Sequence, residues 1–135
     1  MENIIKIIGS GIGTICIYLF GGLDIALQSL LVFMAIDYIT GLMKAYKQKK
    51  INSKVGILGI LKKFGFLCLV AVGCVIDHLT GNTGFIRTSI IYYLVANEGL
   101  SIIENLGAMD ILVPEFLKDK LEQLKNKEVK DEVSK

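Results

Sequence analysis

The sequence predicts an all-α integral membrane protein with three to four transmembrane helices in an antiparallel bundle and a short C-terminal amphipathic helix. Three observations support this prediction. Hydrophobic residues make up 53% of the 135 residues. Long apolar stretches follow one another with short breaks between them. The charged residues are concentrated in two places, because seven lysines lie between Lys44 and Lys63 and twelve charged residues follow Pro114.

Four apolar stretches, at residues 4–20, 25–43, 57–76 and 85–113, form the predicted transmembrane domain at 1–113. Each approaches or exceeds the roughly 20 residues that a helix needs to cross the hydrocarbon core. The short connections between them indicate antiparallel neighbours. The first stretch also resembles a signal peptide, but no A-x-A-like cleavage site follows it.

The connection between the second and third stretches is rich in lysine: Lys44, Lys47, Lys49, Lys50 and Lys54. Basic residues in short loops are retained on the cytoplasmic side of a membrane. This basic loop is therefore predicted to be cytoplasmic, and Asp24 and Asp77 to lie outside. If all four stretches span, both termini are cytoplasmic.

Pro114 closes the last apolar stretch, because a proline ends or kinks a helix. After it, Phe116, Leu117 and Leu121 recur at helical spacing among charged residues. This pattern predicts a short amphipathic helix at 114–124, lying on the inner membrane surface or against a neighbouring helix. The nearly all-charged segment 125–135 is predicted to be disordered.

Enzyme and metal chemistry find no support in the sequence. G-x-S-x-G, H-E-x-x-H and usable Cys/His pairs are absent. The three cysteines lie in apolar runs without metal-ligand spacing, which favours small buried hydrophobic side chains, and His78 has no companion ligand. A net charge of +2 with one concentrated lysine run disfavours nucleic-acid binding. We therefore predict no catalysis, cofactor, metal or nucleic-acid partner.

Gly9 and Gly13 form a G-x-x-x-G pair in the first stretch. Small residues at this spacing let two helix backbones approach closely in lipid, so we interpret the pair as a helix contact. Ordinary small residues without a partner are the alternative. A phosphate-binding loop is excluded, because no strand precedes the glycines and no Lys-Ser/Thr pair follows.

Asp37, Thr40, Gly41 and Lys44 form one stripe on the otherwise apolar second stretch, and Gly41 with Ala45 makes a second small-residue contact. A carboxylate at the centre of a span costs about 2.5–3.5 kcal/mol. One interpretation is an ion pair near the inner leaflet with Lys44 or a neighbouring helix; the other is a proton or substrate relay. Lys62 and Lys63 are interpreted as interface anchors of the third stretch.

The fourth stretch carries a continuous polar face: Asn97, Glu98, Ser101, Glu104 and Asn105. A helix with two glutamates near its middle is not expected to face lipid alone. Its polar side must meet another polar helix, a water-filled space or the headgroup layer. The open alternatives are a hydrogen-bonded helix contact and the lining of an aqueous lesion in an oligomer.

Four segments resemble the toxin secretion/phage lysis holin family, a bacteriophage holin family: DYITG (37–41), INSKVG (51–56) with the lysine pair 62–63, NEGLSIIEN (97–105) and VPEFL (113–117). The resemblance implies a small multi-pass protein of the bacterial cytoplasmic membrane. Such proteins gather as homo-oligomers and open lesions for an endolysin or a toxin. Members usually have about three spans, which leaves the first or the fourth stretch at the interface.

The predicted function is therefore a non-enzymatic, pore-forming holin whose partners are the lipid bilayer, other copies of the chain and an endolysin or toxin. Two alternatives remain open at this point. A small proton-coupled multidrug exporter would use Asp37 or Glu98 as its coupling acid. An anti-holin or passive membrane adaptor would share every motif described above.

Overall fold

A computed structural model describes the backbone of residues 1–133 and the side chains of residues 1–127. This part of the chain folds into five helices: α1 (Glu2–Phe20), α2 (Ile25–Lys47), α3 (Ser53–Thr80), α4 (Phe85–Gly107) and α5 (Glu115–Val133). The described residues contain no strand. The predicted all-α class is confirmed.

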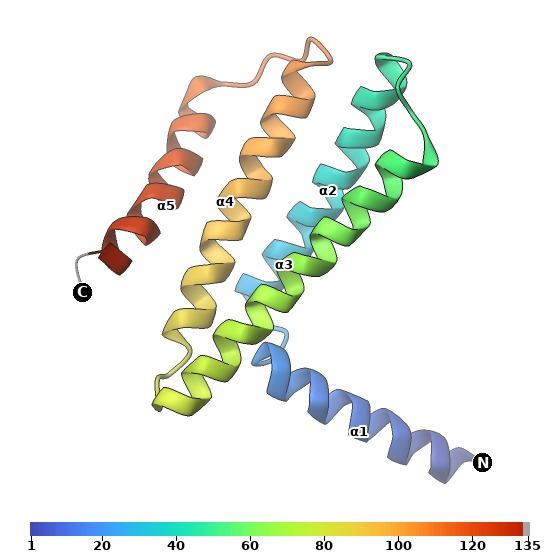
Figure 1. Cartoon of the computed structure of the whole chain (residues 1–135), viewed down its shortest axis with the longest axis vertical. Coiled ribbons are helices and arrows are strands. Elements are labelled where there is room, and N and C mark those ends of the chain that lie inside the picture. The colour runs from blue at the N-terminus through green and yellow to red at the C-terminus, as the bar shows by residue number, and fades with distance from the viewer. Residues whose placement is uncertain (134–135) are drawn as a thin grey trace.

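The helices form an antiparallel bundle with one projecting arm (Figure 1). α2, α3 and α4 run up, down and up, and α5 returns along the side of α4. α4 is the central helix, because it contacts α2, α3 and α5. α1 projects away from the bundle; it packs against α3, and its last residue, Phe20, accepts a hydrogen bond from Arg87 of α4.

The apolar core lies where α2, α3 and α4 meet. Its fully buried side chains include Leu30 of α2, Val70 of α3, and Ile91 and Leu94 of α4. Lipid tails are as apolar as leucine, so inside a membrane such a core is held by close packing and polar contacts rather than by exclusion of water. The polar contacts between these helices therefore carry much of the specificity of the bundle.

Helix ends coincide with the polar breaks in the sequence. The Asp24 carboxylate accepts the Leu27 N–H at 3.0 Å and caps α2, and Asn52 Oδ1 accepts the Val55 N–H at 2.9 Å and caps α3. α1 ends at Gly21, whose φ of 73° lies in the left-handed region that glycine adopts without strain. These local signals explain why the helices begin and end where they do.

Three helices in the described part of the chain are long and apolar enough to cross a membrane: α1, α2 and α3. α4 is not among them, since Arg87, Glu98 and Glu104 interrupt its 23 residues. α4 also ends at Gly107, earlier than the predicted 113, and a turn followed by an irregular stretch leads from it to Pro114. Three helices therefore qualify as spans by length and composition, which agrees with the prediction of three to four spans.

The C-terminal helix differs in length from the prediction. α5 runs from Glu115 to Val133, so it extends past 124 into the segment predicted to be disordered. Residues 134 and 135 of that segment lie outside the described residues. α5 packs along α4, one of the two predicted placements, and a position on the membrane surface stays a prediction.

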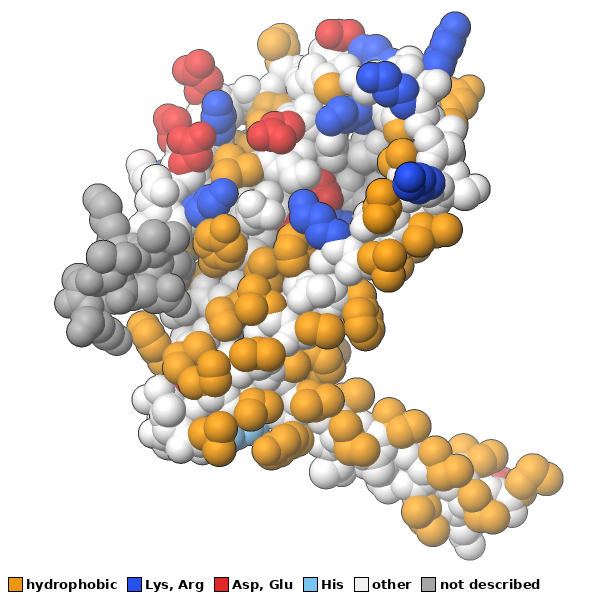
Figure 2. Space-filling view, in the orientation of Figure 1, with side chains coloured by type: hydrophobic (Ala, Val, Ile, Leu, Met, Phe, Trp, Pro, Cys, Tyr) orange, Lys and Arg blue, Asp and Glu red, His pale blue; other side chains and the backbone are white. Residues whose placement is uncertain are grey.

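Charged and apolar side chains separate along the bundle (Figure 2). Lysine and acidic side chains gather at the end that holds the α2–α3 and α4–α5 connections, and apolar side chains cover α1 and the opposite part of the bundle. We call the charged end the basic end, after the lysines of the α2–α3 connection. Such a distribution is typical of a protein with one end at a membrane–water interface.

Candidate functional site

Three charged side chains meet in the interior of the bundle. Lys63 of α3 lies between Asp37 of α2 and Glu98 of α4: its Nζ donates to Asp37 Oδ2 at 2.7 Å and also to Glu98 Oε2. The side chain of Glu98 is fully buried, and those of Lys63 and Asp37 are only 12% and 14% exposed. We call Asp37, Lys63 and Glu98 the ion cluster. It joins α2, α3 and α4.

The ion cluster is not fully satisfied. One ammonium group serves two carboxylates, and Glu98 Oε1 is buried without a hydrogen-bond partner in the described part of the chain. A buried polar atom left without a partner costs about 1–3 kcal/mol. Removing one member of a buried ion pair costs about 3–5 kcal/mol, because an uncompensated charge stays behind. Loss of Lys63 would therefore strongly destabilise the folded subunit, and the unpaired Glu98 oxygen already lowers the stability of the cluster.

Amide and hydroxyl groups extend the ion cluster toward the basic end. Asn105 Nδ2 donates to Asp37 Oδ1 and to Thr40 Oγ1, each at 3.1 Å, and both Asn105 and Thr40 are buried. Gly41 lies beside this contact, and a Cβ at that position would meet the Asn105 amide nitrogen at an ordinary contact distance of 3.7 Å. The acid stripe of α2 and the polar face of α4 are thus brought together inside one subunit.

The five polar residues of α4 do not share one environment. Glu98, Ser101 and Asn105 lie toward α2 and α3, since Ser101 and Asn105 line a hollow with Asp37. Asn97 instead accepts a 3.5 Å hydrogen bond from Lys125 of α5. Glu104 is exposed. The polar face predicted from the sequence is therefore divided: one part lies toward α2 and α3, and another lies toward α5.

The cation beside Asp37 was not identified from the sequence. Lys44 or a neighbouring helix was expected to supply the partner of Asp37, and Lys63 was expected at the membrane interface. Lys63 of the neighbouring α3 holds both carboxylates, and Lys44 lines a hollow near the basic end. The spacing along α3 does not single out Lys63. It lies three and seven residues before Phe66 and Val70, which pack in the core, and Lys62 lies four and eight residues before them, so both lysines fall at same-face spacing.

A second charged group, which the sequence analysis also missed, lies at the end opposite the basic end. Arg87 of α4 is 5% exposed and donates to Asp24 at 2.8 and 3.1 Å, to the Gly22 carbonyl at 3.1 Å and to the Phe20 carbonyl. Asp77 of α3 accepts the N–H groups of Ile86 and Arg87 at 3.0 and 2.8 Å. We call Asp24, Asp77 and Arg87 the arginine cluster. The Arg87 guanidinium lowers the pKa of Asp24 below its ordinary value.

The glycine pair of α1 contacts no other element of the subunit. A Cβ at Gly9 or Gly13 would meet nothing within 4 Å, and α1 has no buried residue. Its C-terminal turn is held by a stacked contact between Tyr18 and His78, with ring centroids 5.0 Å apart. The predicted helix contact of Gly9 and Gly13 therefore stays a prediction about another copy of the chain.

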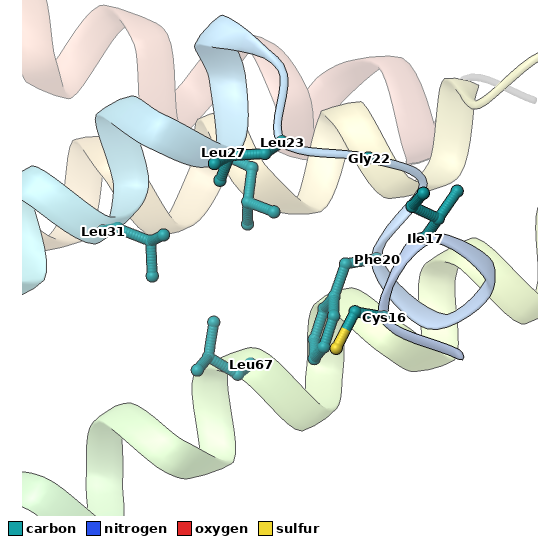
Figure 3. A pocket seen from close by; sticks show the side chains of 8 residues that line it. All are labelled: Cys16, Ile17, Phe20, Gly22, Leu23, Leu27, Leu31 and Leu67. Atoms are coloured by element: carbon teal, nitrogen blue, oxygen red, sulfur yellow. The ribbon is translucent and has the colours of Figure 1, made fainter. Parts of the chain in front are cut away.

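An apolar hollow of about 340 Å³ lies between the end of α1, the start of α2 and the middle of α3 (Figure 3). Phe20, Leu27 and Leu67 are among its lining side chains. Cys16 also lines it and, like Cys68, is exposed, so of the three free cysteines only Cys74 is buried as expected. Within the described residues no group of His, Cys, Asp or Glu could hold a metal ion.

The basic loop is divided between two helices and their connection. Lys44 and Lys47 belong to α2, Lys49 and Lys50 to the connection, and Lys54 to α3. Lys47 pairs with Asp110 and lowers the pKa of that exposed carboxyl, while the other four have no carboxylate partner in the described part of the chain. Ala45 borders the same hollow as Lys44.

Comparison with known proteins places these features in a family. The model of the bacteriophage holin family matches residues 14–126, which include all four segments singled out in the sequence. An uncharacterised 14.9 kDa protein of Clostridium perfringens is 45% identical over 131 residues, covering 94% of this chain and 99% of that protein. A protein of Bacillus phage phi105 described as a probable holin is 36% identical, covering 77% of this chain and 76% of its own length. No solved structure matches.

Proposed function

Because the chain belongs to the bacteriophage holin family, we propose that it acts as a holin: copies gather in the bacterial cytoplasmic membrane and open lesions for an endolysin or a toxin. The observation that carries this proposal is that polar side chains of α4 are paired with neighbouring helices. Within one subunit Glu98 is bonded to Lys63 and Asn97 to α5, while Glu104 is exposed. The packed subunit is the form that precedes assembly.

α4 has two environments in which its polar side chains are satisfied. In the packed subunit, Glu98 and Asn105 bond to groups on α2 and α3. In a ring of copies, the same side chains would meet water. Lipid is unfavourable for both, because intramembrane carboxylates and amides require polar partners or a hydrated cavity. A small free-energy difference between the two arrangements then decides whether a lesion opens.

α5 supplies a second argument for assembly. It lies along α4, yet its exposed side carries Lys118 and Glu122, whose charged groups are 3.9 Å apart. Lipid does not tolerate this side beside a spanning bundle. Copies must turn it toward one another or toward water, or α5 must leave α4 for the membrane surface. With the basic end cytoplasmic, the second movement leaves the C-terminus in the cytoplasm.

The proposal is tested by inducible expression in bacteria with a membrane-potential dye and a co-expressed cytoplasmic cell-wall hydrolase. We expect depolarisation after a lag, followed by lysis that requires the hydrolase. An exporter would change only resistance to small solutes, and an anti-holin or adaptor would accumulate without depolarisation. Either of these results, with the protein present in the membrane, overturns the proposal.

A double variant tests the role of the α4 carboxylates. Glu98→Leu with Glu104→Leu removes two charges from the helix, so insertion should be preserved or improved. The helix then lacks two of the polar groups that would line an aqueous lesion, so we expect lysis to be lost. Membrane fractionation serves as the control for accumulation. Normal lysis by this variant would show that the carboxylates do not line the lesion.

A further inference from the structure

We propose that a groove between α2 and α3 at the basic end binds the phosphate-bearing headgroup of an anionic membrane lipid. Two adjoining hollows form the inner part of the groove, with volumes of about 180 and 260 Å³. They share Gly41, Val55 and Asn105 in their linings. A third hollow of about 530 Å³ continues outward past Tyr38 and Leu42.

The groove forms around the Tyr38 ring, which is seated on two glycines of α3 and fills the space between α2 and α3 at this point. The Tyr38 ring of α2 rests on Gly59, where a Cβ would lie 3.4 Å from the ring, and its hydroxyl rests near Gly56 at 3.3 Å. On either side of Tyr38 the two helices leave open space, and Asn105 of α4 borders the inner part. The inner end of the groove is therefore polar.

Three lysines without a carboxylate partner in the described part of the chain line the groove, and the paired Asp37 and Lys63 line its inner end. Lys44 and Lys50 line one inner hollow, and Lys62 lines the other. In the described part of the chain none of these three has a carboxylate within ion-pair distance, in contrast to Lys47 and Lys63. Gln48 adds a neutral donor beside Lys44. Ammonium groups that face one hollow repel one another, and a bound anion relieves this repulsion.

The outer part of the groove suits hydrocarbon rather than water. Ile57 and Ile60 line it and are more than half exposed on α3, one of the three membrane-spanning candidates. A ligand that fills both parts has an anionic head and an apolar tail. Basic pockets between transmembrane helices near the interface bind such lipids. This inference requires only membrane insertion and is independent of lesion formation.

The test uses the full purified chain in a non-ionic detergent, with bound lipid measured by native mass spectrometry. The probes are phosphatidylglycerol and phosphatidylcholine, titrated separately. We expect phosphatidylglycerol to be retained preferentially. Lys44→Gln with Lys50→Gln should weaken its binding about thirtyfold, because each of the two lysines contributes about 1 kcal/mol near an anionic headgroup.

Lys49→Gln with Lys54→Gln is the matched control. It removes the same charge from the same segment, but neither residue lines the hollows. We expect binding to stay within about twofold of the unchanged chain. Equal losses in the two variants would reveal diffuse surface attraction and overturn the proposal. Equal retention of the two lipids would do the same.

Two further measurements separate the groove from other anion sites. Gly41→Leu fills the inner hollows without changing the net charge and should abolish retention, whereas Gly41→Ala adds only a Cβ at ordinary contact distance and should preserve it. Helical content by circular dichroism checks that each variant folds. Retention that survives in a folded Gly41→Leu variant contradicts the location. Displacement of the lipid by equimolar inorganic phosphate identifies a soluble anion as the ligand and overturns the lipid assignment.

Discussion

The ion cluster and the arginine cluster both join several segments of the bundle, but they differ in how completely their charges are satisfied. In the ion cluster, Lys63 serves two carboxylates and one buried Glu98 oxygen has no partner in the described part of the chain. In the arginine cluster, Arg87 donates to one carboxylate and two backbone carbonyls, and Asp77 accepts two N–H groups.

This difference indicates which part of the bundle can rearrange. The arginine cluster joins the α1–α2 connection to α3 and α4, and its donors and acceptors are matched. We therefore expect this contact to stay formed when the helices move apart elsewhere. The ion cluster joins α4 to α2 and α3 through one shared ammonium group, so α4 separates more readily at this level. Opening of the bundle should therefore begin at the ion cluster.

The largest expected effect comes from Lys63→Met. It leaves two carboxylates buried without a cation, which should destabilise the packed subunit by about 3–5 kcal/mol. Thermal unfolding of the purified chain in detergent measures this loss, and lysis should begin earlier in cells. Lys54→Met, which removes an exposed lysine without a carboxylate partner in the described structure, is the control. Similar behaviour of the two variants would contradict the role of the ion cluster.

A smaller loss is expected from Arg87→Met. Hydrogen bonds to charged groups contribute about 1.5–3 kcal/mol, and the remaining Asp24 is 49% exposed, so water replaces its partner. Unfolding under the same conditions as for Lys63→Met ranks the two. A larger loss for Arg87→Met would still agree with a fixed arginine cluster and a separable ion cluster. It would show, however, that burial of Glu98 makes the loss of Lys63 less costly than expected here.

Asp77→Asn should cost about 1 kcal/mol. Asparagine keeps one acceptor oxygen for the first N–H groups of α4 and loses the negative charge that favours a helix N-terminus. Asp77→Ala removes both acceptors and should cost more. Hydrogen exchange at the first turn of α4 reports the change locally. Protection unaltered in both variants would show that the cap does not hold this turn.

The arginine cluster should also make stability depend on acid pH. Arg87 holds the pKa of Asp24 below its ordinary value, so the ionised carboxylate stabilises the folded state above that ordinary value. The contribution is lost as pH falls through the lowered pKa. The difference in melting temperature between the unchanged chain and Asp24→Asn should therefore shrink from pH 7 to pH 3. A difference independent of pH would contradict the pairing.

The smallest effect is expected at the surface pair of Lys47 and Asp110. Asp110 is exposed and has a φ of 63°, a conformation that asparagine also adopts. Asp110→Asn should leave the melting temperature at neutral pH unchanged within error, because exposed ion pairs contribute little. A clear decrease would indicate that this pair helps to hold the α4–α5 connection against α2.

The sequence by itself determined where the helices lie along the chain and which end of the bundle carries the lysines. Apolar stretches and the polar breaks between them are local features, so the starts of α2 and α4 and the position of the basic loop follow from short-range patterns. The family could also be identified from four short segments. The extent of α5 was underestimated, because a charged segment with few apolar residues does not reveal the helix against which it packs.

Only the tertiary structure decided which polar groups meet. Lys63 rather than Lys44 neutralises Asp37, because α3 turns Lys63 toward the core while Lys44 lies beyond the cluster. The polar residues of α4 are divided because α5 covers the side of Asn97, and α2 and α3 cover the side of Glu98. A helical pattern gives the angular order of side chains around an axis. The rotation of that axis and the choice of neighbour depend on the packing of the whole bundle.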